Sequence, residues 1–167
     1  GIAAHGGSGI SYGLIERLRA TRPEEPMLEL CHRLDKETSG AIVIAKTRKA
    51  LVRMHDLMKE GGVEKHYKLS VKGDWVNERQ PLERYLLPSG ERRVRASSEG
   101  MSAHTIFTVL ERFGSVTYLD AELKTGRTHQ IRVHALSQGF PLVGDDKYGD
   151  FAFNRECTHG LLGAPLK

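Results

Sequence analysis

The stretch HRLDKETSG, residues 32–40, carries one aspartate among basic and turn-forming side chains, between two apolar segments. Residues 27–34 predict a short strand, and the β-branched run 41–45 predicts a buried strand. The stretch ends in a Ser-Gly pair, which is typical of a turn. Asp35 is therefore expected on a loop or at a strand end.

Asp35 has the basic neighbours Arg33 and Lys36. A carboxylate in such a loop can attack an electron-poor carbon, accept a proton or bind a metal. A nearby cation favours the ionised form of a carboxylate, which argues against a role as an acid. An aspartate that only closes its loop onto backbone amides has the same local pattern, so both interpretations stay open at this point.

The chain has 167 residues, of which 39% are hydrophobic and 28% are charged. This length and composition predict one soluble, folded domain over residues 1–167. No apolar run approaches the length of a membrane span, and the first residues do not resemble a signal peptide. We therefore expect a cytoplasmic protein that binds no membrane, and we expect a monomer.

The formal net charge is +4 and the pI is about 9.1, which makes a polyanionic partner plausible. The arginines that lie in or beside turn-rich segments are Arg33, Arg92, Arg93, Arg95, Arg127 and Arg132. Binding sites are often built on such segments. A solvated basic face would explain the same charges.

The cysteine and histidine spacing predicts no metal site. Cys31 and Cys157 are far apart and form no CxxC pair. His129 and His134 are five residues apart, so they do not share a helix face as an i, i+4 ligand pair does. We expect reduced cysteines, no metal and no cofactor.

Two helices are expected in the first third of the chain. Ser11 is expected to cap the first helix, which ends before Pro23. The second covers residues 49–60, has an apolar stripe containing two methionines, and stops at the Gly-Gly pair that follows. Residues 1–13 are glycine-rich but lack the Gly-Lys-Ser/Thr of a phosphate-binding loop.

The rest of the chain is mainly strand-like. Residues 64–73 alternate as a half-buried strand with Tyr67 on the inward face, where its ring could fill the core or line a pocket. A linker containing Trp75 and Pro81 is expected next. Further strands are expected at 92–97, 103–112 and 116–124. The fold class is therefore α+β, with a mixed, largely antiparallel sheet and flanking helices.

A second chemical stretch, LKTGRTHQIRVH, covers residues 123–134. It reads as a strand end, a tight turn at Gly126, and a helix capped by Thr128 that runs to Gly139. The first helical turn would present backbone amides to a phosphate or a carboxylate, together with Arg127, His129 and Arg132. Taken by itself, the stretch favours an ordinary capped helix with a basic edge, since capping alone explains the pattern.

Three stretches together identify a family. HRLDKETSG, then EKHYKLSVKG at 64–73, then LKTGRTHQIRVHALSQGFPLVGDDKYGD at 123–150 closely resemble the RluA-type pseudouridine synthases. Within that family the RluC-like enzymes of ribosomal RNA are the most similar. The resemblance runs from about His5 to Asp150.

The resemblance implies an isomerase that detaches uracil from its ribose, turns the base and rejoins it through carbon 5, with no cofactor or metal. It assigns Asp35 as the essential catalytic group. A carboxylate can add to the anomeric carbon or remove a ribose proton, and the sequence does not choose between them. The matching Tyr67 stacks on the uracil and helps remove the proton from carbon 5, and the matching Arg132 pairs with Asp35.

The resemblance also implies a substrate, large-subunit ribosomal RNA, and residues that bind it. Ile131 or Val133 lines the base pocket, and Arg33 enters the RNA stack where the base has been flipped out. Arg127 and His129 are expected to bind the RNA as well.

The chain departs from the family pattern at both ends. Family catalytic domains usually begin with a strand and a Lys-Pro-Gly segment before the position of His5, and end with a further apolar strand beyond Lys167. The RluC-like enzymes also carry a small N-terminal RNA-binding domain. We therefore expect a fragment of the catalytic domain, without the terminal strands and without the N-terminal RNA-binding domain.

Two other functions remain as alternatives. The first is RNA binding or ribosome assembly without catalysis, with an idle Asp35. The second is a nucleoside or glycan hydrolase, which ranks last because no second carboxylate accompanies Asp35 in its motif. Glu37 is the only nearby candidate and reads as loop surface.

Overall fold

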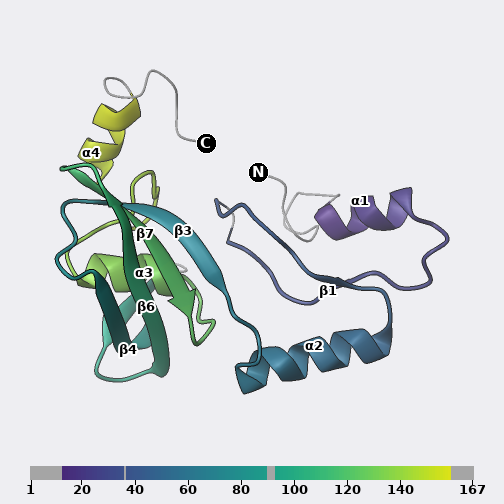
Figure 1. The fold of residues 1–167 in the computed structure, drawn as a ribbon. Coiled ribbons are helices and arrows are strands. Elements are labelled where there is room, and N and C mark those ends of the chain that lie inside the picture. Colours follow the sequence, from purple (N-terminus) through teal and green to yellow (C-terminus); the bar gives the residue numbers. More distant parts are fainter. Residues whose placement is uncertain (1–12, 36, 90–92, 159–167) are drawn as a thin grey trace. The chain divides into compact units, whose positions relative to one another are not determined.

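A computed structural model describes residues 13–35, 37–89 and 93–158 (Figure 1). The chain divides into two compact units, and the boundary in the sequence lies between Val63 and Glu64. Each unit is described by itself below. The single domain expected from composition stays a prediction. None of the helices within the described ranges has the length and apolar character needed to cross a membrane.

The described part of the first unit contains two helices and a two-stranded antiparallel sheet. Its elements are α1 (Leu14–Thr21), β1 (Glu29–Leu30), β2 (Ile44–Ala45) and α2 (Arg48–Glu60) (Figure 1). Gly13 occupies the N-cap position of α1 and Ile15 is its buried residue. Ser11, the expected cap, lies outside the described residues.

The helix predicted over residues 49–60 is confirmed as α2. Thr47 caps its start by accepting a 3.1 Å hydrogen bond from the Ala50 N–H. Gly61 ends the helix with φ 77°, a left-handed conformation that glycine adopts without steric cost. The two methionines of the stripe, Met54 and Met58, pack against a small core of Cys31, Ala45 and Leu51, as expected of core filler.

The predicted strands on either side of HRLDKETSG are mostly wrong in extent. Among the residues that the structure describes here, only Glu29–Leu30 and Ile44–Ala45 pair, and Val43, expected to be buried, is 39% exposed. The reason is physical: within the unit, the described core that includes Ala45 comes from α2 and the strand pair. A two-stranded ribbon with one packed face cannot bury a continuous apolar run.

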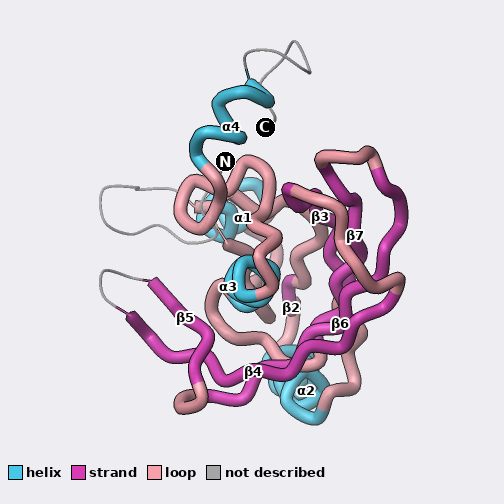
Figure 2. Tube along the Cα trace, turned by 90° about the vertical axis from the view of Figure 1, so that its left-hand side faces the viewer, coloured by secondary structure: helices cyan, strands magenta, loops and turns pink. Residues whose placement is uncertain are grey.

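The second unit is a five-stranded antiparallel sheet with the order β3-β7-β6-β4-β5. The strands are β3 (His66–Lys72), β4 (Arg79–Ser89), β5 (Arg93–Ser97), β6 (Met101–Arg112) and β7 (Val116–Leu123). Helix α3 (Gln130–Ser137) lies inside the curve of this sheet, and a short helix α4 (Phe151–Glu156) follows it in the chain (Figure 2). The predicted α+β class with an antiparallel sheet is confirmed.

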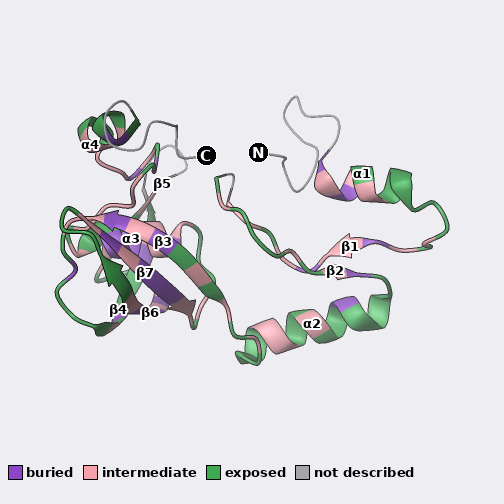
Figure 3. Ribbon diagram, turned by 45° about the horizontal axis from the view of Figure 1, so that its top comes forward, coloured by how far each residue is buried: buried purple, intermediate pink, exposed green. Residues whose placement is uncertain are grey.

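The inner face of the sheet and α3 form the core. Its buried members are Leu69, Val71, Trp75, Leu82, Phe107, Leu119, Ala121 and Ala135. Buried and more exposed residues alternate along β3, as the sequence predicts (Figure 3). On the outer face, Asp120 binds both Lys68 Nζ and His66 Nδ1 at 2.8 Å.

The prediction of a linker that contains Trp75 and Pro81 is wrong for both residues, because Trp75 belongs to the core and Pro81 to a strand. Trp75 is 1% exposed and packs against Phe107 and Phe140, with ring centroids 4.9 and 5.0 Å apart. Pro81 lies within β4, opposite Ile106 of β6. Among the described residues, β5 pairs with β4 only from Tyr85 onward, so Pro81 stands at a sheet edge, where proline is tolerated.

Candidate active site

Asp35 lies on the long loop that joins β1 to β2, as predicted. The base of this loop is closed by a 2.9 Å bond from the Cys31 N–H to the Val43 carbonyl and a 3.0 Å bond from the Val43 N–H to His32 Nε2. The Asp35 carbonyl accepts the Thr38 N–H at 2.9 Å, which forms a turn within the loop. Asp35 is half-buried, whereas Arg33 is exposed.

The start of α3 differs from the prediction. The N-cap residue is His129, not Thr128, and its φ of 55° is left-handed. Gly126, expected to make the tight turn, does not have a left-handed backbone. The predicted stop is confirmed, because Gly139 follows the helix with φ 85°.

The buried side chain of Gln130 ties the loop before α3 to β6. Its Oε1 accepts the Arg127 N–H at 3.0 Å and the Thr125 hydroxyl at 2.7 Å. Its Nε2 donates to the His104 carbonyl at 3.0 Å and to Thr105 Oγ1 at 2.9 Å. A buried amide with all of these bonds made fixes its surroundings strongly.

Arg132 is held by a buried carboxylate that the sequence analysis did not single out. Its Nε and Nη2 donate to Asp145 at 2.7 and 2.8 Å in a bidentate pair. Burial would raise the pKa of the Asp145 carboxyl. The hydrogen bond from Arg132, with those from the backbone N–H groups of Tyr148 and Lys147, outweighs burial and lowers that pKa.

Tyr148 is a second residue that the sequence analysis missed. Its hydroxyl lies 2.8 Å from His129 Nδ1 and accepts the Val94 N–H at 2.8 Å. Its ring lies beneath the Arg132 guanidinium, with Cζ 4.9 Å from the ring centroid. The segment that carries Asp145 and Tyr148 turns tightly, because a Cβ on Gly149 would come within 2.3 Å of the Asp145 carbonyl oxygen.

Of the predicted site residues of the second unit, Arg127, His129, Ile131 and Arg132 lie at the start of α3, and Tyr67 lies on β3. Arg127 is exposed, and its Nε donates to the Ser102 carbonyl at 3.0 Å. Ile131 and Tyr67 are partly buried and pack against the same core. Arg33 and Asp35 belong to the other unit, so the pairing of Asp35 with Arg132 stays a prediction.

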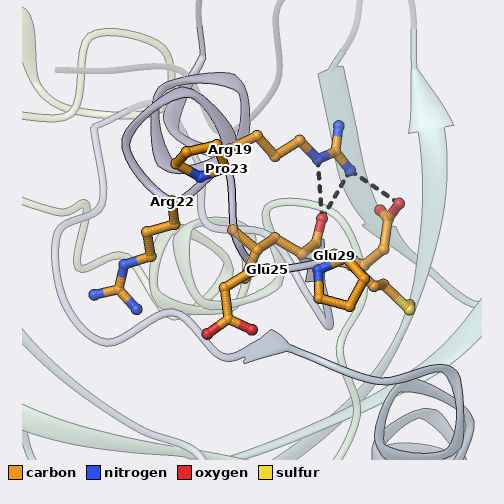
Figure 4. A pocket seen from close by; sticks show the side chains of 8 residues that line it. Arg19, Arg22, Pro23, Glu25 and Glu29 are labelled. Carbon is orange, nitrogen blue, oxygen red and sulfur yellow. Dashed lines mark hydrogen bonds and ion pairs between the residues drawn. The ribbon is translucent and has the colours of Figure 1, made fainter.

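A cavity of about 440 Å³ lies in the first unit, lined by Arg19, Arg22, Pro23, Glu25, Pro26, Met27, Leu28 and Glu29 (Figure 4). Arg19 donates to the Leu28 carbonyl and to Glu29, and Glu25 pairs with Lys46. None of the seven predicted site residues lines this cavity. Because the charges of Arg19 and Glu25 are paired, the cavity is a poor candidate for the site.

Buried His134 predicts a pH-dependent stability. Its ring is 0% exposed, and its Nδ1 lies 2.9 Å from Thr105 Oγ1. Burial, with the charges of Arg84 and His104, lowers its pKa to about 4. The unfolded chain, with a histidine pKa near 6.5, therefore binds more protons, so this stability is full above about pH 6.5.

We expect on the order of 3 kcal/mol of this stability to be lost as the pH falls from about 6.5 through 4. Denaturant unfolding at a series of pH values measures the loss. The variant His134→Gln should flatten this part of the profile. An equal slope in wild type and variant would assign the acid sensitivity to other groups.

The chain is similar in sequence to known proteins. The sequence profile described as "RNA pseudouridylate synthase" matches residues 10–137. The chain is 47% identical to "Ribosomal large subunit pseudouridine synthase C" of Escherichia coli K12, over 98% of this chain and 52% of that protein. The protein of the same name from Pasteurella multocida is 47% identical over 95% of this chain and 50% of its own length.

A solved structure shares the fold. "Human RNA Pseudouridylate Synthase Domain Containing 1" superimposes with a TM-score of 0.75 at 29% identity, over 92% of this chain and 66% of that one. The chain spans about half the length of the curated bacterial relatives it matches.

Proposed function

The chain belongs to the RNA pseudouridylate synthase family, and from that premise we propose that it converts uridine to pseudouridine in large-subunit ribosomal RNA. One observation carries the proposal. The family match spans residues 10–137 and therefore contains Asp35, Tyr67 and Arg132 together. The resemblance seen in three stretches of the sequence is confirmed at the level of the family.

The proposed reaction is an isomerisation without a net change in composition. The bond between N1 of uracil and C1′ of ribose breaks, and a bond between C5 and C1′ forms. C5 loses its proton, and N1 gains one. The enzyme must therefore stabilise charge at C1′ and accept a proton from C5.

Asp35 is the proposed catalytic carboxylate. It can add to C1′ as that carbon becomes electron-poor, or it can remove a neighbouring ribose proton. Its place on a loop closed by hydrogen bonds at its base supports either role, because the loop offers a half-buried carboxylate on an anchored backbone.

Arg132 is proposed to pair with Asp35 and hold its charge and rotamer. A guanidinium carries five N–H donors in a fixed plane, so one arginine can serve two carboxylates. The bidentate bonds to Asp145 support this role, because they fix the plane of that guanidinium.

Tyr67 and Ile131 are proposed to hold the uracil. Both side chains are partly buried against the core of the second unit, which is the setting expected of a stacking platform. Arg33 is proposed to fill the gap left by the flipped base, which offsets part of the few kcal/mol that extrusion costs. Arg127 and His129 are proposed to bind the RNA beside them.

Replacing Tyr67 with phenylalanine keeps the stacking ring and removes only the hydroxyl. We expect RNA affinity to stay near wild type and the single-turnover rate to fall about a hundredfold, because a positioned proton acceptor is lost. Tyr118→Phe is the matched control, since Tyr118 lies on the opposite face of the same sheet. A wild-type rate for Tyr67→Phe would remove the hydroxyl from the mechanism.

The proposed function is tested by incubating the protein with a large-subunit ribosomal RNA transcript and separating the digested nucleosides by chromatography. Chromatography is needed because pseudouridine and uridine have the same mass. The expected result is a pseudouridine peak that grows as uridine is lost. Salt-sensitive RNA binding without pseudouridine would favour the non-catalytic RNA-binding alternative.

A further inference from the structure

Tyr148 contacts both basic residues at the start of α3. Its hydroxyl lies 2.8 Å from His129 Nδ1, and its ring lies under the Arg132 guanidinium at 4.9 Å. The tyrosine is itself fixed, because its backbone N–H donates to Asp145 at 2.9 Å and its hydroxyl accepts the Val94 N–H. It is 7% exposed, so little solvent competes for these contacts.

His129 has a backbone conformation that needs support. Its φ of 55° is one that residues with a Cβ adopt rarely. The bond to the Tyr148 hydroxyl and the edge-on contact of the two rings, with centroids 5.4 Å apart, support this conformation.

The hydrogen bonds of the Tyr148 hydroxyl also favour one tautomer of His129. The tyrosine oxygen already accepts the Val94 N–H, and its own proton needs an acceptor. His129 Nδ1, at 2.8 Å, lies in position to accept that proton. The ring proton of neutral His129 then sits on Nε2, which becomes a hydrogen-bond donor.

We propose that Tyr148 is a positioning residue with two separable actions. Its hydroxyl holds His129 as the Nε2–H tautomer, which donates to an oxygen of the RNA substrate. Its ring holds the guanidinium plane of Arg132 in the orientation that Asp145 binds. The proposal rests on the proposed function, and it adds a residue to those that the family resemblance assigns.

The two actions predict different kinetic effects. Tyr148→Phe removes only the hydroxyl and should raise KM for RNA about fivefold with kcat nearly unchanged, as expected for the loss of one hydrogen bond. Tyr148→Leu also removes the ring. Its kcat should be about tenfold lower than that of Tyr148→Phe, as expected when an ordered catalytic group is misplaced. Tyr118→Phe should change neither.

A double-mutant cycle distinguishes positioning from general stability. In a His129→Ala background, Tyr148→Phe should have no further effect on KM, because the side chain through which the hydroxyl is proposed to act has been removed. Additive effects of the two substitutions, or an unchanged KM in Tyr148→Phe alone, would overturn the proposal.

NMR readouts test the proposal without turnover. In the wild type, the ¹⁵N shifts of His129 should report the Nε2–H tautomer, and Tyr148→Phe should shift the ring toward a mixture. Tyr148→Leu should speed solvent exchange of the Arg132 Nε–H. If the wild type forms no pseudouridine but these signals behave as stated, the proposed function fails while the positioning stands. Unchanged signals in both variants would overturn the positioning.

Discussion

Asp35→Asn is expected to lower pseudouridine formation by about a thousandfold or more while RNA affinity stays within about threefold. Asparagine has nearly the same shape as aspartate, so the loop should keep its structure. The neutral amide can neither add to C1′ nor accept a ribose proton. Single-turnover conversion, measured by nucleoside chromatography, and filter binding of the RNA separate the two quantities.

Glu37→Gln is the matched control for this experiment. Glu37 lies two residues away, is exposed, and loses the same charge in the variant. We expect a rate within about twofold of wild type, because an exposed charge contributes little interaction free energy. If Asp35→Asn kept a tenth or more of the wild-type rate, Asp35 would not be the essential group.

Arg132→Ala is expected to cost both stability and activity. It leaves the Asp145 carboxylate, whose side chain is 4% exposed, without its bidentate partner. Breaking such a buried pair typically costs about 3–5 kcal/mol of unfolding free energy. We also expect turnover to fall about a hundredfold, because the proposed orientation and charge of Asp35 depend on this guanidinium.

The double variant Arg132→Ala/Asp145→Ala separates the two losses. Removing both partners leaves no unpaired buried charge, so part of the lost stability should return in denaturant unfolding. Turnover should stay low, because the guanidinium is still missing. If the double variant regained both stability and turnover, Arg132 would be structural and its proposed pairing with Asp35 would be wrong.

The lowered pKa of Asp145 predicts how the stability contributed by the Arg132–Asp145 pair depends on pH. A carboxyl with a folded pKa below its unfolded value adds stability that is present above that unfolded value, near pH 4. This stability is lost as the pH falls through the folded pKa. The double variant should therefore lose less stability in strong acid than the wild type does.

The sequence predicted best where a local pattern determines the structure. The stripe of α2 and its glycine stop depend on residues within one helix, and the alternation of β3 depends on one packed face. Strand β4 was not predicted, because Pro81 and the charged residues beside it are typical of a linker. Proline is nevertheless tolerated in a strand at a sheet edge. The strand predicted over residues 41–45 was too long, because β-branched content does not show whether a second layer covers the segment.

The contacts at the start of α3 could not be predicted, because they join distant parts of the chain. Gln130 reaches back to His104 and Thr105 on β6, and Tyr148 reaches Val94 on β5. Asp145 and Tyr148 stood within a matched stretch, but only the folded backbone shows what they touch. The roles of Asp35, Tyr67 and Arg132 came from the family resemblance, not from spacing.

The proposed reaction of this chain moves the C1′ bond of uridine from N1 to C5 and releases the C5 proton. The most direct measurement is tritium release from large-subunit ribosomal RNA labelled at C5 of uracil, with wild type and Asp35→Asn run in parallel. We expect release to the solvent with the wild type and background counts with the variant. RNA binding without tritium release, or equal release by both proteins, would contradict the account.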